Sequence, residues 1–376
     1  MQLYIHIPFC VRKCLYCDFL SGPQSQEVID KYVDCLCKEI KSQTEIVSKV
    51  STLFIGGGTP SVLSEVQIQK IFATLMDVFI FEEQAEITIE VNPGTITKEK
   101  FEAYKKCGIN RISFGLQSTN NEELKLLGRI HTYEEFLNNY RLARECGFDN
   151  INIDLMSAIP KQTVSSFENT LEKVIALQPE HISAYSLIIE DGTPFAKMYG
   201  EGCAKEVDLP TEEEERRIYY RTVELLEEAG YQRYEISNYA KCGRECKHNL
   251  GYWERKEYLG LGLGASGFVN EMRYRNTDDM TVYLEHALNP NCIKVETEQL
   301  SLVSQMEEYM FLGLRKTRGV SVSQFFRIFG KTMESIYGEQ LSKLENEALI
   351  RRDGDRVMLT EQGIDVSNYV LAEFLQ

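Results

Sequence analysis

The stretch Tyr4-Ile-His-Ile-Pro-Phe-Cys10-Val-Arg-Lys-Cys14-Leu-Tyr-Cys17 joins a strand-like run to three cysteines that lie within eight residues of one another. After it, short β-rich runs alternate with segments whose apolar residues recur every three or four positions, which predicts parallel β-α units. Six such units are fewer than the eight of a closed barrel, so we predict an α/β fold, an open, partial six-stranded parallel β/α barrel. We expect strands over 3–7, 52–55, 86–91, 111–115, 151–154 and 181–187, and helices over 28–40, 66–79, 136–146 and 167–177.

The character of the chain changes twice beyond the predicted barrel. A helix is expected over 211–229, because Thr211 and Glu214 have the spacing of a capping box. Residues 239–268 are rich in Cys, Gly, Tyr and Arg, and the last 75 or so residues predict three helices and a hairpin around Asp353-Gly354. We therefore predict a barrel domain over 1–235, a connecting segment over 236–300, and a mainly helical, winged-helix-like domain over 301–376.

The amino-acid composition argues against several classes of function. The 376 residues carry 41 basic and 57 acidic side chains, a formal net charge of −16, which argues against nucleic-acid binding. There is no apolar run of the roughly 18–20 residues that a membrane span requires, and the first residues lack the pattern of a signal peptide. Eleven cysteines, an odd number, without an export signal favour the reducing cytoplasm, where clustered cysteines more often bind metal than pair.

The three cysteines follow the first predicted strand directly, at the mouth of the barrel. Zinc sites usually take two close pairs of ligands, whereas here three thiolates share one tight loop. A 4Fe–4S cluster needs four iron ligands, so Cys10, Cys14 and Cys17 would leave one iron open to another ligand. The alternative is that these are buried or zinc-binding cysteines.

The spacing C-x3-C-x2-C resembles the signature of the radical S-adenosylmethionine (SAM) superfamily. That resemblance implies a 4Fe–4S cluster whose open iron is chelated by SAM, and cleavage of SAM to a 5′-deoxyadenosyl radical by an electron from the cluster. Further motifs resemble the coproporphyrinogen-oxidase-like branch of the superfamily and together cover most of residues 1–155. They are Tyr4-x-His6-Ile-Pro-Phe-Cys10, Gly56-Gly-Gly-Thr-Pro-Ser61, Ile89-Glu90-Val-Asn-Pro93, Phe114-Gly-Leu-Gln-Ser118, Gly128-Arg129-x-His131 and Asp154.

The resemblance also implies roles for single residues. Gly57, Gly58 and Thr59 would meet the amino group of SAM, and Glu90 would contact SAM, with ribose hydroxyls or a cation compensating its charge. Further expected contacts are Gln117 and Arg129 to the carboxylate or ribose, Asp154 to ribose or adenine, and Tyr4 and Tyr16 packed against the cluster and adenosine. For each polar residue the alternative is a structural salt bridge or turn cap, and for the tyrosines it is core burial. His6, inside a strand, is given no ligand role.

The resembled branch contains two activities, an oxygen-independent coproporphyrinogen III oxidase of porphyrin metabolism and a haem chaperone. The oxidases carry a fourth cysteine where this chain has Phe19, and they have an amino-terminal extension, whereas here the motif already begins at Tyr4. The run His248-Asn-Leu-Gly-Tyr-Trp253 matches the H-N-x-x-Y-W motif associated with haem binding in the chaperones. All three features favour the chaperone group, known as HemW, with the oxidase as the alternative.

His248 suits an axial ligand of haem iron, because a neutral imidazole is common in that role, and Tyr252 and Trp253 suit contact with a flat macrocycle. Two alternatives remain: a zinc or thiolate site formed with Cys242 and Cys246, or a loop histidine beside core aromatics. Nearby basic residues that we consider as partners for the haem propionates are Arg244, Lys247, Arg255 and Lys256.

We therefore expect a haem chaperone of radical SAM type, with a 4Fe–4S cluster, SAM and haem as its bound groups. Its expected partners are haem-requiring acceptor proteins and an electron donor for the cluster, without nucleic acid. A peripheral membrane contact and a homodimer are left open, as is enzymatic turnover. RNA modification is the third class considered, and the mixed charge around Arg351-Arg352 argues against it.

Overall fold

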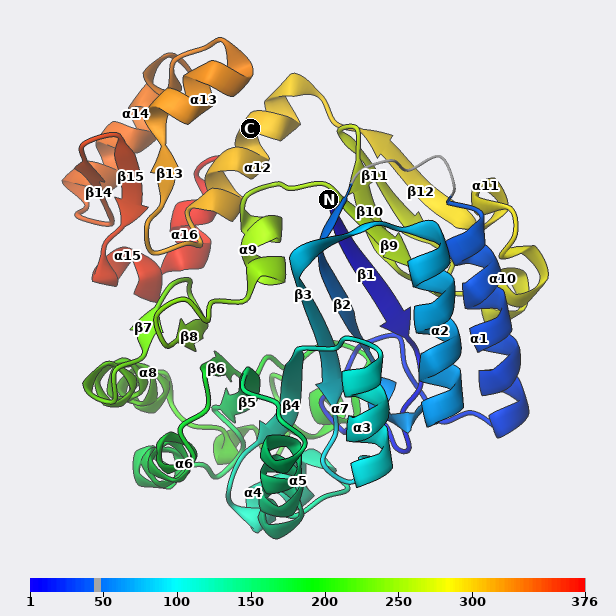
Figure 1. Ribbon diagram of the computed structural model, residues 1–376. Coiled ribbons are helices and arrows are strands. Elements are labelled where there is room, and N and C mark those ends of the chain that lie inside the picture. Colours follow the sequence, from blue (N-terminus) through cyan, green and yellow to red (C-terminus); the bar gives the residue numbers. More distant parts are fainter. Residues whose placement is uncertain (44–48, 376) are drawn as a thin grey trace.

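A single curved sheet with helices along its outer side forms most of the computed structural model, which describes residues 1–43 and 49–375 (Figure 1). The strand order is β12-β11-β10-β9-β1-β2-β3-β4-β5-β6-β8-β7. Strands from β9 through β6 run parallel to their neighbours, and antiparallel strands extend the sheet at both ends. Because the order is linear, the sheet does not close on itself, and the predicted open barrel is confirmed.

The strands of this sheet are β1 (Gln2–Ile7), β2 (Val50–Gly57), β3 (Phe81–Val91), β4 (Arg111–Gln117), β5 (Ile151–Ser157), β6 (His181–Ser186), β7 (Gln232–Arg233), β8 (Asn238–Ala240), β9 (Tyr258–Leu261), β10 (Ser266–Val269), β11 (Met272–Asn276) and β12 (Lys294–Gln299). The helices of the same part are α1 (Gln26–Lys41), α2 (Glu65–Val78), α3 (Lys98–Lys106), α4 (Asn121–Leu127), α5 (Tyr133–Glu145), α6 (Val164–Ala176), α7 (Pro194–Tyr199), α8 (Glu212–Glu228), α9 (Lys247–Trp253), α10 (Met280–His286) and α11 (Pro290–Ile293), with short 3-10 turns at Pro60–Val62 and Glu206–Asp208.

The barrel strands alternate between apolar side chains that face the helices and polar side chains that face the interior. In β1, Leu3, Ile5 and Ile7 are buried in the core shared with the helices, whereas Tyr4 and His6 point the other way. Parallel sheets covered on both faces are usually apolar on both. Because this sheet is apolar mainly on the face that packs against the helices, polar side chains line the barrel interior, which therefore suits polar ligands.

The predicted capping box at the start of α8 is present. The backbone N–H of Glu214 donates to Thr211 Oγ1 at 3.3 Å, and the Thr211 N–H donates back to the Glu214 carboxylate at 2.8 Å. Such a cap stabilises a helix by about 1 kcal/mol, because it pairs backbone donors that would otherwise lack partners.

Residues 236–300, which we expected to be a connecting segment, belong to the main sheet. Strand β9 pairs with β1 in parallel, with Leu3 beside Leu259, and β10, β11 and β12 continue from it as an antiparallel extension. Leu259 and Leu261 join the same buried core as the barrel strands. Burial of these side chains, rather than the Cys, Gly and Arg content of the segment, decides where it packs.

The carboxyl-terminal part has its own core. It contains α12 (Leu302–Gly313), β13 (Val320–Ser321), α13 (Val322–Phe329), α14 (Met333–Asn346), β14 (Ile350–Asp353), β15 (Arg356–Leu359), α15 (Glu361–Asp365) and α16 (Ser367–Ala372), with a small sheet in the order β13-β15-β14. Met310, Phe325, Tyr337 and Leu341 are among its buried side chains. The predicted hairpin is present, with Asp353 paired to Arg356 across a two-residue turn, so helices plus a β wing give the winged-helix-like shape (Figure 1).

No helix in residues 1–43 and 49–375 is long and apolar enough to cross a membrane.

Candidate cluster and cofactor site

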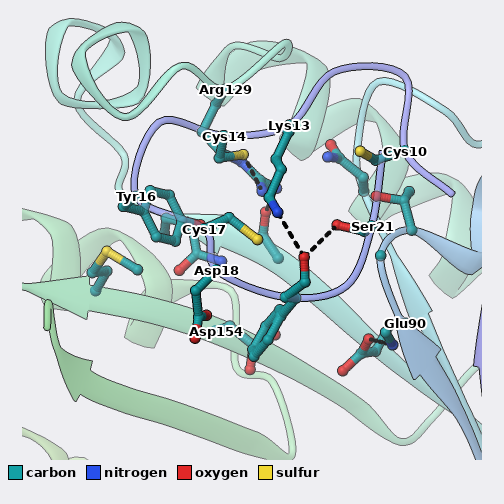
Figure 2. Close-up of a pocket in the computed structure, with 18 of the residues that line it drawn as sticks. Cys10, Lys13, Cys14, Tyr16, Cys17, Asp18, Ser21, Glu90, Arg129 and Asp154 are labelled. Atoms are coloured by element: carbon teal, nitrogen blue, oxygen red, sulfur yellow. Dashed lines mark hydrogen bonds between the residues drawn. The ribbon is translucent and has the colours of Figure 1, made fainter. Parts of the chain in front are cut away.

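A cavity of about 320 Å³ opens at the carboxyl ends of the barrel strands, where parallel α/β folds place their reactive sites. Every predicted site residue except Tyr4 and His248 lines it (Figure 2). The predicted residues found there are Cys10, Cys14, Tyr16, Cys17, Gly57, Gly58, Thr59, Glu90, Gln117, Arg129 and Asp154.

The cysteine loop between β1 and α1 is tied to the barrel at several backbone points. The Cys10 N–H donates to Gly22 O at 3.1 Å, and the Leu15 N–H donates to Leu127 O at 3.0 Å, which fixes the loop against the end of α4. Within the loop, Lys13 Nζ donates to Phe19 O at 2.8 Å (Figure 2). The loop is therefore held in place by backbone and lysine contacts, and its three cysteines form no disulfide.

The three thiols face the cavity from separate corners of the loop, with Cys14 and Cys17 on one side and Cys10 on the other (Figure 2). Among the described residues, no three metal-binding side chains close around one point as a single ion would require. A 4Fe–4S cluster takes one cysteine per iron, so its ligands stand apart in the same way. Burial raises the pKa of the Cys10 and Cys17 thiols, which a bound metal would reverse by deprotonating them. The donor set fits a cluster better than a single ion.

Arg129 lies between the cysteine loop and β4. Its Nη1 is 3.5 Å from Cys14 Sγ and its Nη2 donates to Gly115 O, while Nε is buried without a partner among the described residues. A guanidinium with an unused donor in a cavity suits an anionic ligand group such as a carboxylate. This geometry fits the expected contact with the carboxylate of SAM.

The glycine run at the end of β2 packs against protein on its far side. A Cβ on Gly57, where φ is +111°, would lie 2.6 Å from the His6 ring, and one on Gly58 would lie 2.6 Å from Phe9 O. Its conformation and its neighbours both require glycine, because a side chain would displace β1 and the start of the cysteine loop. The run thus lets the backbone form one wall of the cavity.

Two carboxylates enter the cavity from neighbouring parts of the sheet. Glu90 accepts the Gly57 N–H at 3.1 Å, and Asp154 accepts from Asn152 at 2.8 Å and Ser113 at 3.3 Å. Burial, with the charge of Asp154 adding to it, raises the pKa of Glu90 to about 8, and burial also raises the pKa of Asp154. Ribose hydroxyl groups that donate hydrogen bonds to these carboxylates would offset the free energy cost of burying them in the charged form.

Gln117 reaches the cavity through a distorted strand end. The register of β4 against β5 shifts between Gly115 and Gln117, and Gln117 has a φ of +74°. Its side chain accepts a hydrogen bond from Tyr185 OH at 3.0 Å. A bulge and a rarely used backbone conformation at a cavity are typical of a functional site.

Tyr4 lies one layer below the cavity. Its hydroxyl is 3.0 Å from His6 Nδ1, and His6 Nε2 is 3.0 Å from Leu20 O, so Tyr4 supports the cysteine loop through His6. Tyr4 does not line the cavity, because alternate inward residues of one strand lie at different heights, and its expected contact with the cluster and adenosine stays a prediction. His6 is a packed, hydrogen-bonded residue, as the sequence indicated.

His248 is not part of the cavity. It lies at the opposite, amino-terminal end of the barrel, and its ring nitrogens are bonded to Thr52 Oγ1 at 2.7 Å and Tyr252 OH at 2.9 Å. Only 1 % of the residue is exposed. Both ring nitrogens are therefore engaged in hydrogen bonds, so a role as axial haem ligand stays a prediction that would require one of these bonds to break.

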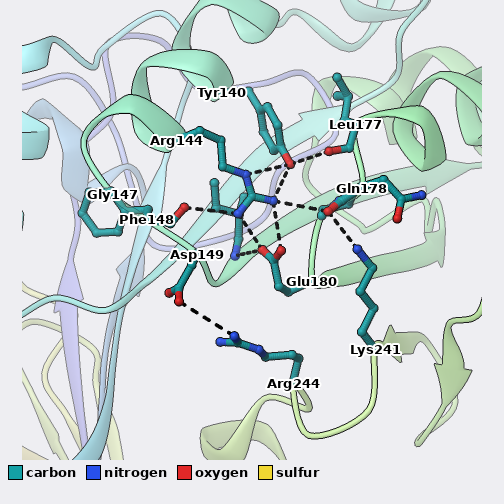
Figure 3. Close-up of polar contacts among 12 residues, drawn as sticks. Tyr140, Arg144, Gly147, Phe148, Asp149, Leu177, Gln178, Glu180, Lys241 and Arg244 are labelled. Atoms are coloured by element: carbon teal, nitrogen blue, oxygen red, sulfur yellow. Dashed lines mark hydrogen bonds and ion pairs between the residues drawn. The ribbon is translucent and has the colours of Figure 1, made fainter.

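The two cysteines of the alternative zinc site do not come together, and most of the basic residues considered as partners of the haem propionates are engaged elsewhere. Cys242 is exposed while Cys246 is buried with its thiol directed at Glu86, so they do not face one site. Arg244 lies 3.8 Å from Asp149, beside the Arg144–Glu180 ion pair, and Lys241 Nζ donates to Gln178 O at 3.0 Å, so these two residues hold the loop before α9 (Figure 3). Arg255 and Lys256 are likewise paired with acidic side chains.

Several lining residues were not predicted from the sequence. They are Ser113, Met156 and Tyr185 from the inner face of the sheet and Leu187, Ile188 and Glu190 from the segment after β6. Ser113 pairs with the predicted Glu90 of the neighbouring strand, Met156 lies two residues from Asp154, and Tyr185 pairs with Met156. The period of two along each strand was the signal that could have found them.

Comparison with known proteins agrees with this site. Residues 4–174 match the family model described as the radical SAM superfamily, and residues 300–366 match the HemN C-terminal domain. The heme chaperone HemW of Lactococcus lactis is 39% identical over 99% of this chain and 96% of its own length. The chain belongs to the HemW family of the radical SAM superfamily.

Other members and relatives of the family extend the comparison. The heme chaperone HemW of Bacillus subtilis is 36% identical over 99% of this chain and 98% of that protein. The solved structure of coproporphyrinogen III oxidase (HemN) from Escherichia coli, described as a radical SAM enzyme, has a TM-score of 0.87 at 25% identity, over 99% of this chain and 89% of that chain. Membership of the radical SAM superfamily implies a 4Fe–4S cluster and SAM, which the cavity residues fit.

Proposed function

We propose that this protein is a haem chaperone that binds a 4Fe–4S cluster and SAM at the barrel mouth and passes haem to acceptor proteins. The observation that carries the proposal is the full-length similarity to proteins described as heme chaperone HemW. Phe19, in the place where the resembled oxidases carry a fourth cysteine, supports the same choice.

At the cavity, Cys10, Cys14 and Cys17 would hold the cluster and leave one iron for SAM. The bound cluster supplies a low-potential electron. Arg129 would bind the carboxylate of SAM through its unused Nε, and the two carboxylates would accept from ribose or adenine. The backbone of Gly57 and Gly58 would form one wall of the ligand site, because glycine lets it pack closely against His6 and Phe9 on the far side.

The mouth of this cavity also supports haem binding there. Phe19 is 63% exposed and Ile188 is 68% exposed, and both border the cavity. Large apolar side chains exposed beside a functional cavity are typical of a ligand contact. Arg12 and Lys13 border the same opening and would meet the haem propionates. Haem bound at the mouth would not need His248, at the amino-terminal end of the barrel, as a ligand of its iron.

A titration of anaerobically reconstituted protein with haem, followed by the Soret band, tests the proposal. Haem binding is expected, and Ile188→Asp is expected to weaken it. The matched control is Val207→Asp, because Val207 is 88% exposed but does not border the cavity. Absence of haem binding would refute the chaperone. If Ile188→Asp and Val207→Asp weakened haem binding equally, the mouth of the cavity would be refuted as the haem site.

The oxidase is the second candidate, because the fold matches that of HemN from Escherichia coli with a TM-score of 0.87. Incubation of the reduced, SAM-loaded protein with coproporphyrinogen III separates the two functions. A chaperone leaves the propionates intact, and conversion to protoporphyrinogen would establish the oxidase instead. Transfer of haem to an acceptor apoprotein, compared with transfer by free haem, tests the last step of the proposed function.

A further inference from the structure

Helix α9, which carries the His248–Trp253 motif, closes the floor of the barrel. Gln2, Thr52 and Glu86 lie side by side in β1, β2 and β3, as the strand register shows, and all three bind the first turn of α9. Gln2 Nε2 donates to His248 O at 3.0 Å, and the Glu86 carboxylate accepts the N–H groups of Lys247 and His248, each at 3.1 Å. One row of inward-facing side chains thus docks the helix.

His248 is the side chain by which α9 enters the barrel. Besides its bonds to Thr52 and Tyr252, its ring stacks on Phe54 with centroids 5.2 Å apart, and Phe54 stacks on Tyr4 at 6.4 Å. A Cβ on Gly251 would lie 2.2 Å from Gln2 Oε1, so the helix also approaches β1 closely. The imidazole is therefore an interior packing group with both nitrogens used.

The other end of α9 holds the carboxyl-terminal domain. Arg315, just after α12, lies over the Trp253 ring with Cζ 4.4 Å from its centroid. Glu254 pairs with Lys316 at 3.8 Å and with Arg318. In Figure 1, α9 lies between the barrel strands and α12.

A second contact beside α9 ties the same two parts together. Glu308 of α12 is buried and binds Arg255 at 3.0 Å and Arg273 of β11 at 2.7 Å. Loss of Glu308 would take from the buried Arg255 one of its two acidic partners, the other being Glu271, so the contact resists separation. The motif and its flanking residues therefore face the barrel on one side and the carboxyl-terminal domain on the other.

We infer that the His248–Trp253 motif is a joint that seals the barrel floor and fixes the carboxyl-terminal domain to it, and that His248 is not an iron ligand. The inference that the motif joins the carboxyl-terminal domain to the barrel does not depend on the proposed haem function. The inference that His248 is not an iron ligand rests on that function. Burial lowers the pKa of His248 to about 3, so the ring stays neutral in this role. The motif then serves the fold at a place remote from the cavity.

Hydrogen exchange of the protein without haem tests the joint from both sides. Arg315→Met removes the cation over Trp253 and should speed exchange of α9 amides severalfold, whereas the control Arg352→Met, which breaks pairs with Glu334 and Glu345 elsewhere in the same domain, should not. Thr52→Val, from the barrel side, should speed exchange both in α9 and in residues 313–318. Unchanged α9 amides in Arg315→Met, or effects of Thr52→Val confined to β2, would overturn the joint.

Haem titration tests the statement about iron. His248→Gln keeps a donor and an acceptor and should retain haem affinity within about threefold, well under the 1.4 kcal/mol of a tenfold change. The control is His286→Gln, a half-exposed histidine at the end of α10. A tenfold or larger loss of haem affinity in His248→Gln alone, with an unchanged unfolding midpoint, would show that His248 ligates iron. Failure of the unaltered protein to bind haem would refute the chaperone proposal and leave the exchange result to decide the joint.

Discussion

Gly57→Ala is the substitution for which the structure predicts the sharpest local effect. Gly57 has a φ of +111°, and an added Cβ would lie 2.6 Å from His6 Cε1 and Nδ1. The methyl group cannot be accommodated by a flexible chain end, because the His6 ring is held on both sides, by Tyr4 OH at 3.0 Å and Leu20 O at 3.0 Å. The change therefore strains the backbone and displaces His6 together.

The magnitude follows from these contacts. A non-glycine residue in this part of conformational space costs about 1–3 kcal/mol. Each of the two His6 hydrogen bonds contributes about 0.5–1.5 kcal/mol to the free energy of unfolding. We expect Gly57→Ala to lower that free energy by about 2–6 kcal/mol, a large part of the roughly 5–15 kcal/mol of a typical domain. Because His6 also holds Leu20 of the cysteine loop, SAM binding should weaken too.

Urea unfolding of the protein and SAM binding to the reconstituted cluster are the assays. The matched control is Gly108→Ala, where φ is +86° and no atom lies within 4 Å of the added Cβ. This control should lose only about 1–2 kcal/mol from backbone strain, with SAM binding unaltered. Equal unfolding midpoints for the two variants, with equal SAM binding, would refute the role assigned to His6 and to the glycine wall.

Three other substitutions test separate parts of the structure. Cys14→Ala should abolish the cluster absorbance and its electron paramagnetic resonance signal after reconstitution, and retention of a full cluster would contradict the ligand assignment. Burial raises the pKa of Glu90 to about 8, so between pH 4.5 and 8 the folded protein without SAM keeps a proton that the unfolded chain has lost, and stability falls as pH rises through this window. Glu90→Gln should flatten that fall in urea unfolding measured at several pH values; an unchanged slope would rule out Glu90 as its source. Glu308→Ala should lower the free energy of unfolding by about 1–3 kcal/mol, because the buried Arg255 loses one of its two acidic partners and keeps Glu271, and an unchanged free energy of unfolding would show that the pair is dispensable.

The order of the barrel elements follows from local sequence, and the extension of the sheet does not. Strand and helix periodicity and the Thr211 capping box are properties of a few neighbouring residues, which is why these predictions agree with the structure. Strands β9 and β10 are four residues long and contain glycine, so they carry little periodicity of their own. Strand β9 takes its place by pairing with β1, more than 250 residues away in the sequence, and β10 by pairing with β9, and no local pattern encodes the pairing with β1.

The site residues divide in the same way. Those in motifs at strand ends, such as Gly57, Glu90 and Asp154, meet in one cavity because parallel strands end at one edge of the sheet. Tyr4 and His248 lie outside this cavity, and a motif states which residue types occur together but not at which height of the barrel they lie. The spacing of four between His248 and Tyr252, which puts both on one face of a helix, was a local sign that the imidazole has a partner of its own.

A polar barrel interior explains why the motif is needed at the floor. The same alternation that supplies Glu90 to the cavity places Glu86 four residues earlier on the same inner face, at the opposite end, where no ligand enters. A buried carboxylate without donors there would cost several kcal/mol. Helix α9 supplies two backbone N–H groups and the Cys246 thiol to Glu86, and an imidazole to the hydroxyl of Thr52. A barrel lined with polar groups for its cofactor therefore brings a polar helix to the opposite end, and the groups that satisfy Glu86 and Thr52 there come from Cys246, Lys247 and His248 at the start of α9.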